Sequence, residues 1–258
     1  MPAHDLDLLL DAAKAAGDIA LKHFKNDPEV WEKDDDQGPV TVADLAINRM
    51  LEAELQAARP DYGWLSEETE DSAARLGKER VFILDPIDGT RAFIMGHENF
   101  AHSFAVAQNG VVTAAVVHMP AKEMTFAATR GGGATMNGAP ITPSDVAELA
   151  QAEILAAKPM MDAGYWAGGV PPVKRNFRSS LAYRLCLVAK GRFDAMITFR
   201  PAWEWDVAAG DLICTEAGAC VFDANGETPV YNSPAAKIPG MIACPSQLKA
   251  PFLAHLVV

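Results

Sequence analysis

The sequence lacks the features that mark several large classes of protein. No apolar run approaches the ~18 residues of a membrane-spanning helix, and the acidic first residues carry neither a basic start nor a signal-peptide cleavage site. Runs rich in Lys and Arg are absent from a chain whose formal net charge is −12. Such a chain is poorly suited to bind nucleic acid or an anionic membrane surface. We therefore expect no nucleic-acid partner and no membrane partner.

Cysteine is scarce as well. The four cysteines form no Cys-x-x-Cys pair and no zinc-site spacing, and they are Cys186, Cys214, Cys220 and Cys244. Three of them have apolar neighbours in the sequence, which predicts buried free thiols. Free thiols indicate a reducing compartment, and we expect the cytoplasm.

Two common catalytic signatures are also missing. The chain contains neither Gly-x-Ser-x-Gly nor Gly-x-x-x-x-Gly-Lys, which disfavours serine hydrolases of the α/β-hydrolase type and P-loop enzymes.

What the sequence does have is an uneven distribution of acidic residues. Residues 1–100 contain 22 acidic and 10 basic residues, whereas residues 101–258 contain 12 of each. The acidic excess can be a solvated surface, or it can include carboxylates arranged to hold divalent cations. The positions of the individual carboxylates decide between these interpretations.

The first half of the chain predicts two helices followed by strands. Apolar residues at spacings of three and four indicate a helix over residues 5–24, and the polar stretch 26–39 is typical of an exposed loop. Thr41, with Asp44 three residues later, has the pattern of a helix N-cap. Strands are expected at 63–66, 81–84, 101–108 and 111–118, with a hairpin turn at Asn109-Gly110. Residues 124–130 and the Gly-rich stretch 131–138 predict further antiparallel strands and a turn. We expect one antiparallel sheet through residues 64–140.

The second half predicts alternating strands and helices. Strands are expected at 154–156, 195–199, 219–222 and 241–243, and helices at 180–190, at 207–217 and at the end of the chain. The fold class is therefore α/β (α+β), with an antiparallel first half and a mixed second half. At 258 residues, one large domain or two joined halves are expected. We divide the chain into residues 1–145 and 146–258, with the functional site between the halves.

The most informative segment is 85–90, which reads Asp-Pro-Ile-Asp-Gly-Thr and follows the apolar run 81–84. The pattern predicts a buried strand that ends at Asp85, a second carboxylate at Asp88, and a short helix over residues 90–94. Backbone N–H groups at the start of that helix would bind an anion. Two carboxylates beside a phosphate would repel it, but a divalent cation between them makes the arrangement attractive.

Other carboxylates could complete this site. Glu67 and Glu68 follow the strand 63–66, and Asp206 lies at the expected N-cap of the helix 207–217. The phosphatases of the haloacid dehalogenase family also carry paired aspartates after a buried strand, but theirs are two residues apart. The separation of three in this chain, with proline after the first aspartate, disfavours a phosphoaspartyl intermediate.

These residues resemble the motifs of the inositol monophosphatase superfamily, which comprises Mg²⁺-dependent, Li⁺-sensitive phosphatases. Matching segments occur in the same order along nearly the whole chain. They are Pro39-Val40-Thr41-x-Ala43-Asp44, Ser66-Glu67-Glu68, Asp85-Pro86-Ile87-Asp88-Gly89-Thr90, and Trp205-Asp206-x-Ala208-Ala209-Gly210 continuing to Glu216-Ala217-Gly218. The resemblance implies a layered αβαβα sandwich, a homodimer, and hydrolysis of a small phosphorylated metabolite by metal-activated water.

The resemblance also implies a role for each matched residue. It assigns two or three Mg²⁺ ions to this site. The implied metal ligands are Glu67, Asp85, the carbonyl of Ile87, Asp88 and Asp206. The implied catalytic residues are Glu67 and Thr90, which orient the attacking water, and Asp44, which lies near a weaker third ion. The implied substrate-binding residues are Asp88, Gly89, Thr90, Arg91 and Asp206.

The substrate stays open between several phosphate esters. Thr198 stands where inositol phosphatases place a glutamate, although Glu204 lies nearby and could replace it. Arg91 makes the chain similar to phosphatases of 3′-phosphoadenosine 5′-phosphate and of histidinol phosphate. A regulatory family member without catalysis is a further alternative. His97 and His102 could approach the site, but we expect structural roles for both.

Overall fold

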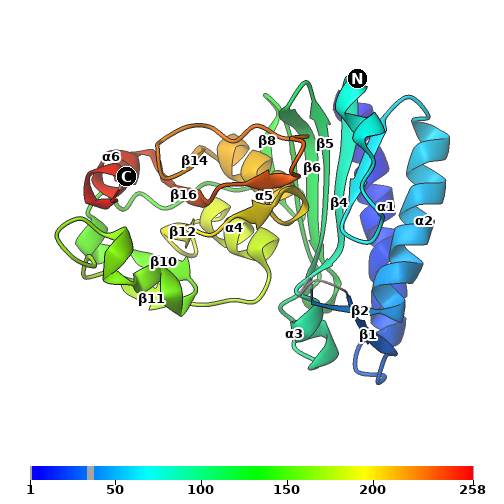
Figure 1. Ribbon diagram of the computed structural model, residues 1–258, viewed down its shortest axis with the longest axis horizontal. Helices are drawn as coiled ribbons and strands as arrows, with labels where there is room; N and C mark the ends of the chain where they lie inside the picture. The colour runs from blue at the N-terminus through cyan, green and yellow to red at the C-terminus, as the bar shows by residue number, and fades with distance from the viewer. Residues whose placement is uncertain (1, 34–37, 258) are drawn as a thin grey trace.

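A computed structural model describes residues 2–33 and 38–257 of the chain. Two sheets and the helices around them form five layers (Figure 1). Helices α1 and α2 cover the outer face of a seven-stranded sheet, and α4 and α5 lie between this sheet and a five-stranded sheet. Helix α6 covers the far face of the five-stranded sheet. The predicted αβαβα sandwich is confirmed.

The helices lie close to the predicted ranges. They are α1 (Pro2–His23), α2 (Val42–Ala58), α3 (Thr90–Ile94), α4 (Leu181–Ala189), α5 (Glu204–Ala217) and α6 (Ser246–His255). None of the helices within residues 2–33 and 38–257 has the length and hydrophobicity needed to cross a membrane.

The two large sheets differ in their connectivity. The seven-stranded sheet follows chain order and consists of β3 (Gly63–Ser66), β4 (Arg80–Asp88), β5 (Ala101–Gln108), β6 (Val111–Met119), β7 (Met124–Thr129), β8 (Gly133–Met136) and β9 (Ala139–Pro140). The five-stranded sheet has the order β11 (Lys174–Asn176), β10 (Glu153–Ala156), β12 (Ala195–Thr198), β16 (Met241–Pro245) and β14 (Ala219–Phe222). Two short pairs join β1 (Val30–Glu32) to β2 (Pro39–Thr41) and β13 (Ala202–Trp203) to β15 (Lys237–Ile238).

Strand β4 is buried on both faces, as its continuous apolar run predicts. Phe82 and Leu84 belong to the core formed with α1 and α2. Val81 and Ile83 point the other way and belong to the core formed with α4 and α5, because side chains alternate along a strand. The strand is therefore fixed from both sides, and so is the segment that follows it.

Local sequence signals account for several element boundaries. Helix α2 begins with the predicted capping box, in which the Thr41 hydroxyl accepts a hydrogen bond from the Asp44 N–H and the Asp44 side chain accepts one from the Thr41 N–H. The hairpin between β5 and β6 turns at Asn109 and Gly110, whose φ angles are 50° and 81°. Both residues tolerate this left-handed region, as the dipeptide predicts.

Two expectations about the strands are wrong. Strand β3 pairs parallel to β4, so the sheet is mixed instead of wholly antiparallel. Strand β4 also does not end at Asp85, because pairing with β5 resumes at Asp88 after a register shift. Pro86 has no N–H to donate and interrupts the ladder, but it does not terminate it.

The polar stretch 26–39 differs in part from the expected loop, because residues 30–32 form β1. Residues 34–37 lie outside the described part of the chain. The thiol prediction is confirmed, since the four cysteines are free and Cys186, Cys214 and Cys244 are buried.

Gly210 provides a test of the packing between α4 and α5. A Cβ atom at this position would lie 2.4 Å from Leu185 Cδ1 and 2.6 Å from Leu185 Cβ. We expect Gly210→Ala to lower the free energy of unfolding by about 2 kcal/mol through overpacking, because the clash exceeds the gain in helix propensity of up to ~1 kcal/mol. Thermal unfolding measures this change.

Gly77→Ala is the matched control, since no atom of the described residues lies within 4 Å of its Cβ position. It should leave the unfolding temperature nearly unchanged. Equal stability of the two variants would contradict the close approach of the two helices.

Candidate functional site

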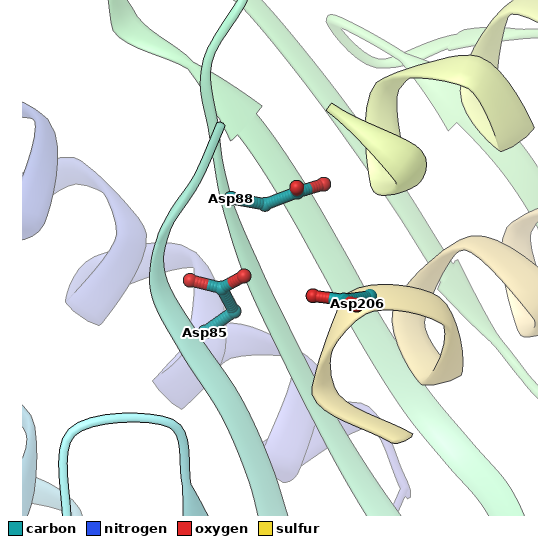
Figure 2. A group of neighbouring side chains, drawn as sticks. All are labelled: Asp85, Asp88 and Asp206. Atoms are coloured by element: carbon teal, nitrogen blue, oxygen red, sulfur yellow. The ribbon is translucent and has the colours of Figure 1, made fainter. Parts of the chain in front are cut away.

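Three carboxylates from distant parts of the sequence meet at one point. Asp85 lies in β4, Asp88 at the end of β4, and Asp206 in the first turn of α5. One oxygen of each lies within 4.8 Å of the others, and the three carboxyl groups point toward a shared space (Figure 2). Like charges at this separation repel each other strongly when they are partly shielded from water. The cluster therefore favours either bound protons or a bound cation.

Asp85 is the most constrained of the three. It is 1% exposed, and neither of its carboxyl oxygens has a hydrogen-bond partner among the described residues. Burial raises the pKa of Asp85 well above its ordinary value, and the charges of Glu67, Asp88 and Asp206 raise it further. A buried carboxylate without a partner is costly, whereas carboxylate oxygens are preferred ligands of Mg²⁺. The donor set thus fits a hard divalent cation.

Asp88 is held by the start of α4. Its Oδ2 accepts hydrogen bonds from the Ser180 hydroxyl at 2.5 Å and from the Ala182 N–H at 2.7 Å. Burial raises the pKa of Asp88 to about 6, although these two hydrogen bonds act in the opposite direction. The free N–H groups of a helix N-terminus favour a negative charge. Asp88 is therefore fixed in orientation, with Oδ1 left for another partner.

Asp206 does not cap α5 as predicted. The helix begins three residues earlier than expected, with Trp203 as its N-cap residue, so Asp206 lies inside the first turn. Burial raises the pKa of Asp206 well above its ordinary value, and the negative charges of Asp88 and Glu67 raise it further. From the first turn of α5, its side chain points toward Asp85 and Asp88 (Figure 2).

Glu204 explains the earlier helix start. This side chain is fully buried, and its carboxylate accepts hydrogen bonds from the N–H groups of Asn232 and Ser233 at 2.6 and 2.8 Å. The idea that Glu204 replaces a substrate-binding glutamate is therefore wrong, because both oxygens serve the interior. Arg75, buried in the connection between β3 and β4, reaches the same two residues through the Asn232 side chain at 2.7 Å and the Ser233 carbonyl at 3.0 Å.

The parallel pairing of β3 with β4 places Glu67 beside Asp85. Ser66 pairs with Leu84, and the Glu67 N–H donates to the Leu84 carbonyl at 3.2 Å. The carboxyl ends of both strands therefore meet at one edge of the sheet. An antiparallel pair would have placed the end of one strand against the start of the other.

Lys33 lies against the Glu67–Glu68 pair, although no motif in the sequence points to it. Its ammonium group is 2.9 Å from Glu67 Oε1 and 2.6 Å from Glu68 Oε1. Burial lowers the pKa of Lys33, but the two carboxylates outweigh burial and the pKa is raised overall. Burial raises the pKa of Glu68 to about 7, with a further contribution from the charge of Glu67. The Lys33 ammonium group therefore offsets the negative charge of Glu67 and Glu68.

The turn after Asp88 depends on a glycine. Gly89 has a φ of 97°, and a Cβ atom there would lie 3.0 Å from the Asn99 carbonyl oxygen. The Thr90 hydroxyl donates to the Ile87 carbonyl at 3.0 Å, so its lone pairs remain available to accept a hydrogen bond. In the described part of the chain, the backbone N–H groups of Gly89 and Thr90 have no recorded acceptor. This turn therefore offers two backbone N–H donors and the Thr90 hydroxyl oxygen as an acceptor.

A cavity of about 460 Å³ contains most of the predicted site residues. Its lining includes Glu67, Asp85, Ile87, Asp88, Gly89, Thr90, Arg91 and Asp206. Sequence reasoning gave no site role to several other lining residues, among them Met95, Phe177, Ser179, Trp203 and Trp205, although Trp205 lies in a matched motif. The pair of tryptophans flanking Glu204 was a signal that could have indicated them, whereas residues 177–179 precede α4 without any recognisable motif.

Other candidates lie away from the cavity lining. Asp44 is fully buried, and its Oδ1 has no partner among the described residues, while burial raises its pKa to about 7. His97 is exposed. His102 is fully buried and donates from Nδ1 to the Pro86 carbonyl, and burial lowers its pKa to about 3. A neutral His102 therefore contacts the strand behind the cluster and does not line the cavity.

Comparison with known proteins gives one consistent family. The sequence model of the Inositol monophosphatase family matches residues 3–257. A histidinol-phosphatase of Chlorobaculum parvum is 33% identical over 237 residues, which cover 88% of this chain and 89% of that protein. An inositol-1-monophosphatase of Rhizobium meliloti is 36% identical over 202 residues, which cover 72% of this chain and 73% of that protein.

Solved structures agree with the sequence comparison. The extragenic suppressor protein suhB of Bartonella henselae superimposes with a TM-score of 0.82 at 28% identity, covering 97% of each chain. A family match over nearly the full length, relatives above 30% identity and a shared fold lead to the same result. The chain belongs to the inositol monophosphatase family and is a phosphatase, that is, a phosphoric monoester hydrolase.

Proposed function

We propose that the chain is a Mg²⁺-dependent phosphomonoesterase that hydrolyses a small phosphorylated metabolite with an activated water molecule. The observation that carries this proposal is the buried carboxylate of Asp85, which has no hydrogen-bond partner among the described residues and lies within 4.8 Å of Asp88 and Asp206. Two or three Mg²⁺ ions would be held by Glu67, Asp85, the Ile87 carbonyl, Asp88 and Asp206. Asp44 lies near the weaker third ion in this proposal.

Bound Mg²⁺ would lower the pKa of a water molecule and stabilise the negative charge that develops on the leaving oxygen. Phosphoryl transfer requires little covalent chemistry from the protein, so positioning and charge neutralisation dominate. Thr90 is suited to orient the water because its hydroxyl proton is already donated to the Ile87 carbonyl. Glu67 would accept a hydrogen bond from the same water once Lys33 no longer contacts it.

The turn after β4 would bind the phosphate group. The N–H groups of Gly89 and Thr90 would donate to phosphate oxygens, and the positive φ of Gly89 gives this turn its shape. Asp88 and Asp206 would contact the substrate through the metal ions. Arg91 is exposed, lines the same cavity, and would supply a positive charge to a second anionic group.

The names of the relatives point to different phosphate esters. One carries the name of a histidinol-phosphatase and another that of an inositol-1-monophosphatase, at 33% and 36% identity. L-histidinol phosphate, myo-inositol 1-phosphate and 3′-phosphoadenosine 5′-phosphate are therefore the esters to compare. Phosphate release from each, with and without Mg²⁺ and Li⁺, tests the proposal, and we expect Li⁺ to inhibit.

The alternative is a binding protein without turnover. The name of the suhB structure, an extragenic suppressor protein, motivates this alternative. Stable association with a partner, together with no phosphate release from any of the three esters, would favour it.

We further propose a cytoplasmic homodimer in which the site lies between residues 1–145 and 146–258. The free cysteines support a reducing compartment. Asp206 and Ser180 from the second half approach Asp85 and Asp88 from the first, which supports the location of the site.

The carboxylate of Asp85 provides the most direct test of the function. Asp85→Asn keeps the size of the side chain but removes the charge that would bind Mg²⁺. We expect kcat/KM to fall about 10³-fold, equivalent to about 4 kcal/mol of transition-state stabilisation. Steady-state phosphate release at several Mg²⁺ concentrations measures the loss. Asp145→Asn, at an exposed aspartate, should keep full activity, and full Mg²⁺-dependent turnover by Asp85→Asn would refute the assignment.

The raised carboxyl pKa values predict how the metal-free protein responds to pH. Asp44 and Glu68 have folded pKa values of about 7, above those of the unfolded chain, so the folded state holds protons that the unfolded state has released. Their contribution to stability is present at low pH and is lost as pH rises through 7. With a chelator present, the unfolding temperature should therefore fall between pH 6.5 and 8. This window avoids the opposite effect of His102, which destabilises the fold mainly below pH 6.5.

Adding Mg²⁺ should reverse the decline, with a larger gain in unfolding temperature at pH 8 than at pH 6.5. Binding to the folded state alone raises stability, and deprotonated carboxylates bind the ion more tightly. Asp85→Asn should reduce this gain, whereas Asp145→Asn should retain it. A Mg²⁺ effect that is independent of pH would contradict a site built from these carboxylates.

A further inference from the structure

The cavity is apolar and aromatic beside its carboxylates. Met95 and Phe177 line it although they are 62% and 49% exposed, and Trp203 and Trp205 line it as well. Single exposed apolar side chains are common, but several that gather along one groove mark a place where a ligand or partner binds. Their position in the lining of the proposed catalytic cavity indicates that the covering group belongs to the ligand.

The two tryptophans form a rigid surface before any ligand binds. Their rings are stacked, with centroids 4.6 Å apart and an interplanar angle of 10°. The Lys237 ammonium lies 3.9 Å from the centroid of Trp203, so this ring is contacted by both Trp205 and Lys237. Glu204, between the tryptophans in sequence, anchors the start of α5 through its buried carboxylate. A preorganised surface binds a ligand without first losing side-chain entropy.

Phe177 is held in place by a cation–π contact with Arg184. The guanidinium of Arg184 lies 4.5 Å from its ring centroid, and Arg184 itself is held by the carbonyls of Arg178 and Ser179. Phe177 nevertheless remains about half exposed. An aromatic ring that is fixed in place and open to the cavity can contact a flat group.

The same lining provides few partners for a hydroxyl-rich ligand. Apart from the carboxylates and Thr90, the polar side chains among the described lining residues are Arg91 and Ser179, besides the indole N–H groups. The Glu204 carboxylate serves Asn232 and Ser233, and Thr198 is not part of the lining. A polyol bound here would lose hydrogen bonds to water and would face apolar side chains instead. Hydroxyl groups left without partners weaken binding, so this lining is poorly suited to a polyol.

We propose that Phe177, Trp203 and Trp205 form an aromatic subsite that receives a flat heteroaromatic ring on the alcohol part of the phosphate ester. The substrate class is then a phosphate monoester that carries an imidazole or a purine, in preference to a polyol phosphate. This inference rests on the proposed function and specifies its substrate. Trp205 directly precedes Asp206 in sequence, which ties the subsite to the carboxylates that would bind the phosphate through metal ions.

A second copy of the chain covering Phe177 and Met95 would be another reason for their exposure. Trp205 argues for the ligand, because it lines the same cavity as Asp206, the residue that follows it in sequence. The two possibilities give different results when Phe177 is changed, since a subsite alters substrate preference and an interface alters the oligomeric state.

The test compares kcat/KM for L-histidinol phosphate, 3′-phosphoadenosine 5′-phosphate and myo-inositol 1-phosphate. The wild-type chain should prefer one or both ring-bearing esters, and the panel shows whether the ring is an imidazole or a purine. Phe177→Leu keeps an apolar side chain without a flat face and should lower the ratio of ring ester to inositol ester about tenfold. Phe177→Tyr keeps the flat face and should retain the ratio within about threefold. Leu76→Ala, at an exposed leucine outside the cavity, is the control and should leave all three rates unchanged.

Product binding gives a readout that does not depend on turnover. Tryptophan fluorescence of the wild-type chain, with Mg²⁺ and inorganic phosphate present, should respond to L-histidinol and not to myo-inositol if the ring is an imidazole. Adenosine 5′-phosphate, followed by calorimetry, is the matching probe for a purine. Phe177→Leu should weaken the response.

The outcomes separate this inference from the proposed function. If no ester is hydrolysed, the proposed function fails, and product binding alone decides whether the subsite exists. If the wild-type chain prefers myo-inositol 1-phosphate and Phe177→Leu leaves the ratios unchanged, the subsite is refuted while the phosphatase function stands. A change in oligomeric state in Phe177→Leu, without a change in preference, also refutes the subsite.

Discussion

The mutual repulsion of buried carboxylates is the constraint on which the rest of the structure depends. Asp85, Asp88 and Asp206 bring like charges within 4.8 Å of one another, and no hydrogen bond within the described residues satisfies Asp85. Two packed cores hold β4 from opposite faces, the start of α4 holds Asp88, and the first turn of α5 holds Asp206. Most of the surrounding architecture therefore positions charges that would otherwise separate. A divalent cation would turn this repulsion into attraction.

Patterns that depend on local chemistry could be predicted from the sequence. The capping box of Thr41 and Asp44, the Asn109-Gly110 hairpin and the buried run of β4 follow from neighbouring residues alone. The direction in which β3 pairs with β4 was predicted wrongly, because pairing direction depends on how the connection between two strands packs and not on either strand. The start of α5 was missed for a similar reason, since it is set by a contact between Glu204 and residues 28 positions later.

The candidate site shows the same division. Residues within a motif, such as segment 85–90, could be proposed from spacing and from the resemblance to the family. Lys33 and Phe177 could not, because each lies in a stretch without a motif and reaches the site only through the fold. The acidic excess of residues 1–100 was a weak guide, since few of those residues take part in the cluster and Asp206 comes from the second half.

The segment formed by Asn232 and Ser233 has an effect that its sequence does not suggest. It binds Glu204, which sets the start of the helix carrying Trp205 and Asp206, and it binds Arg75, which secures the connection that begins at Glu67. One short segment thus holds both the helix that carries Asp206 and the connection that follows Glu67. Residues far from the carboxylates in sequence, such as Asn232 and Ser233, therefore help to set the shape of the cavity through these hydrogen bonds.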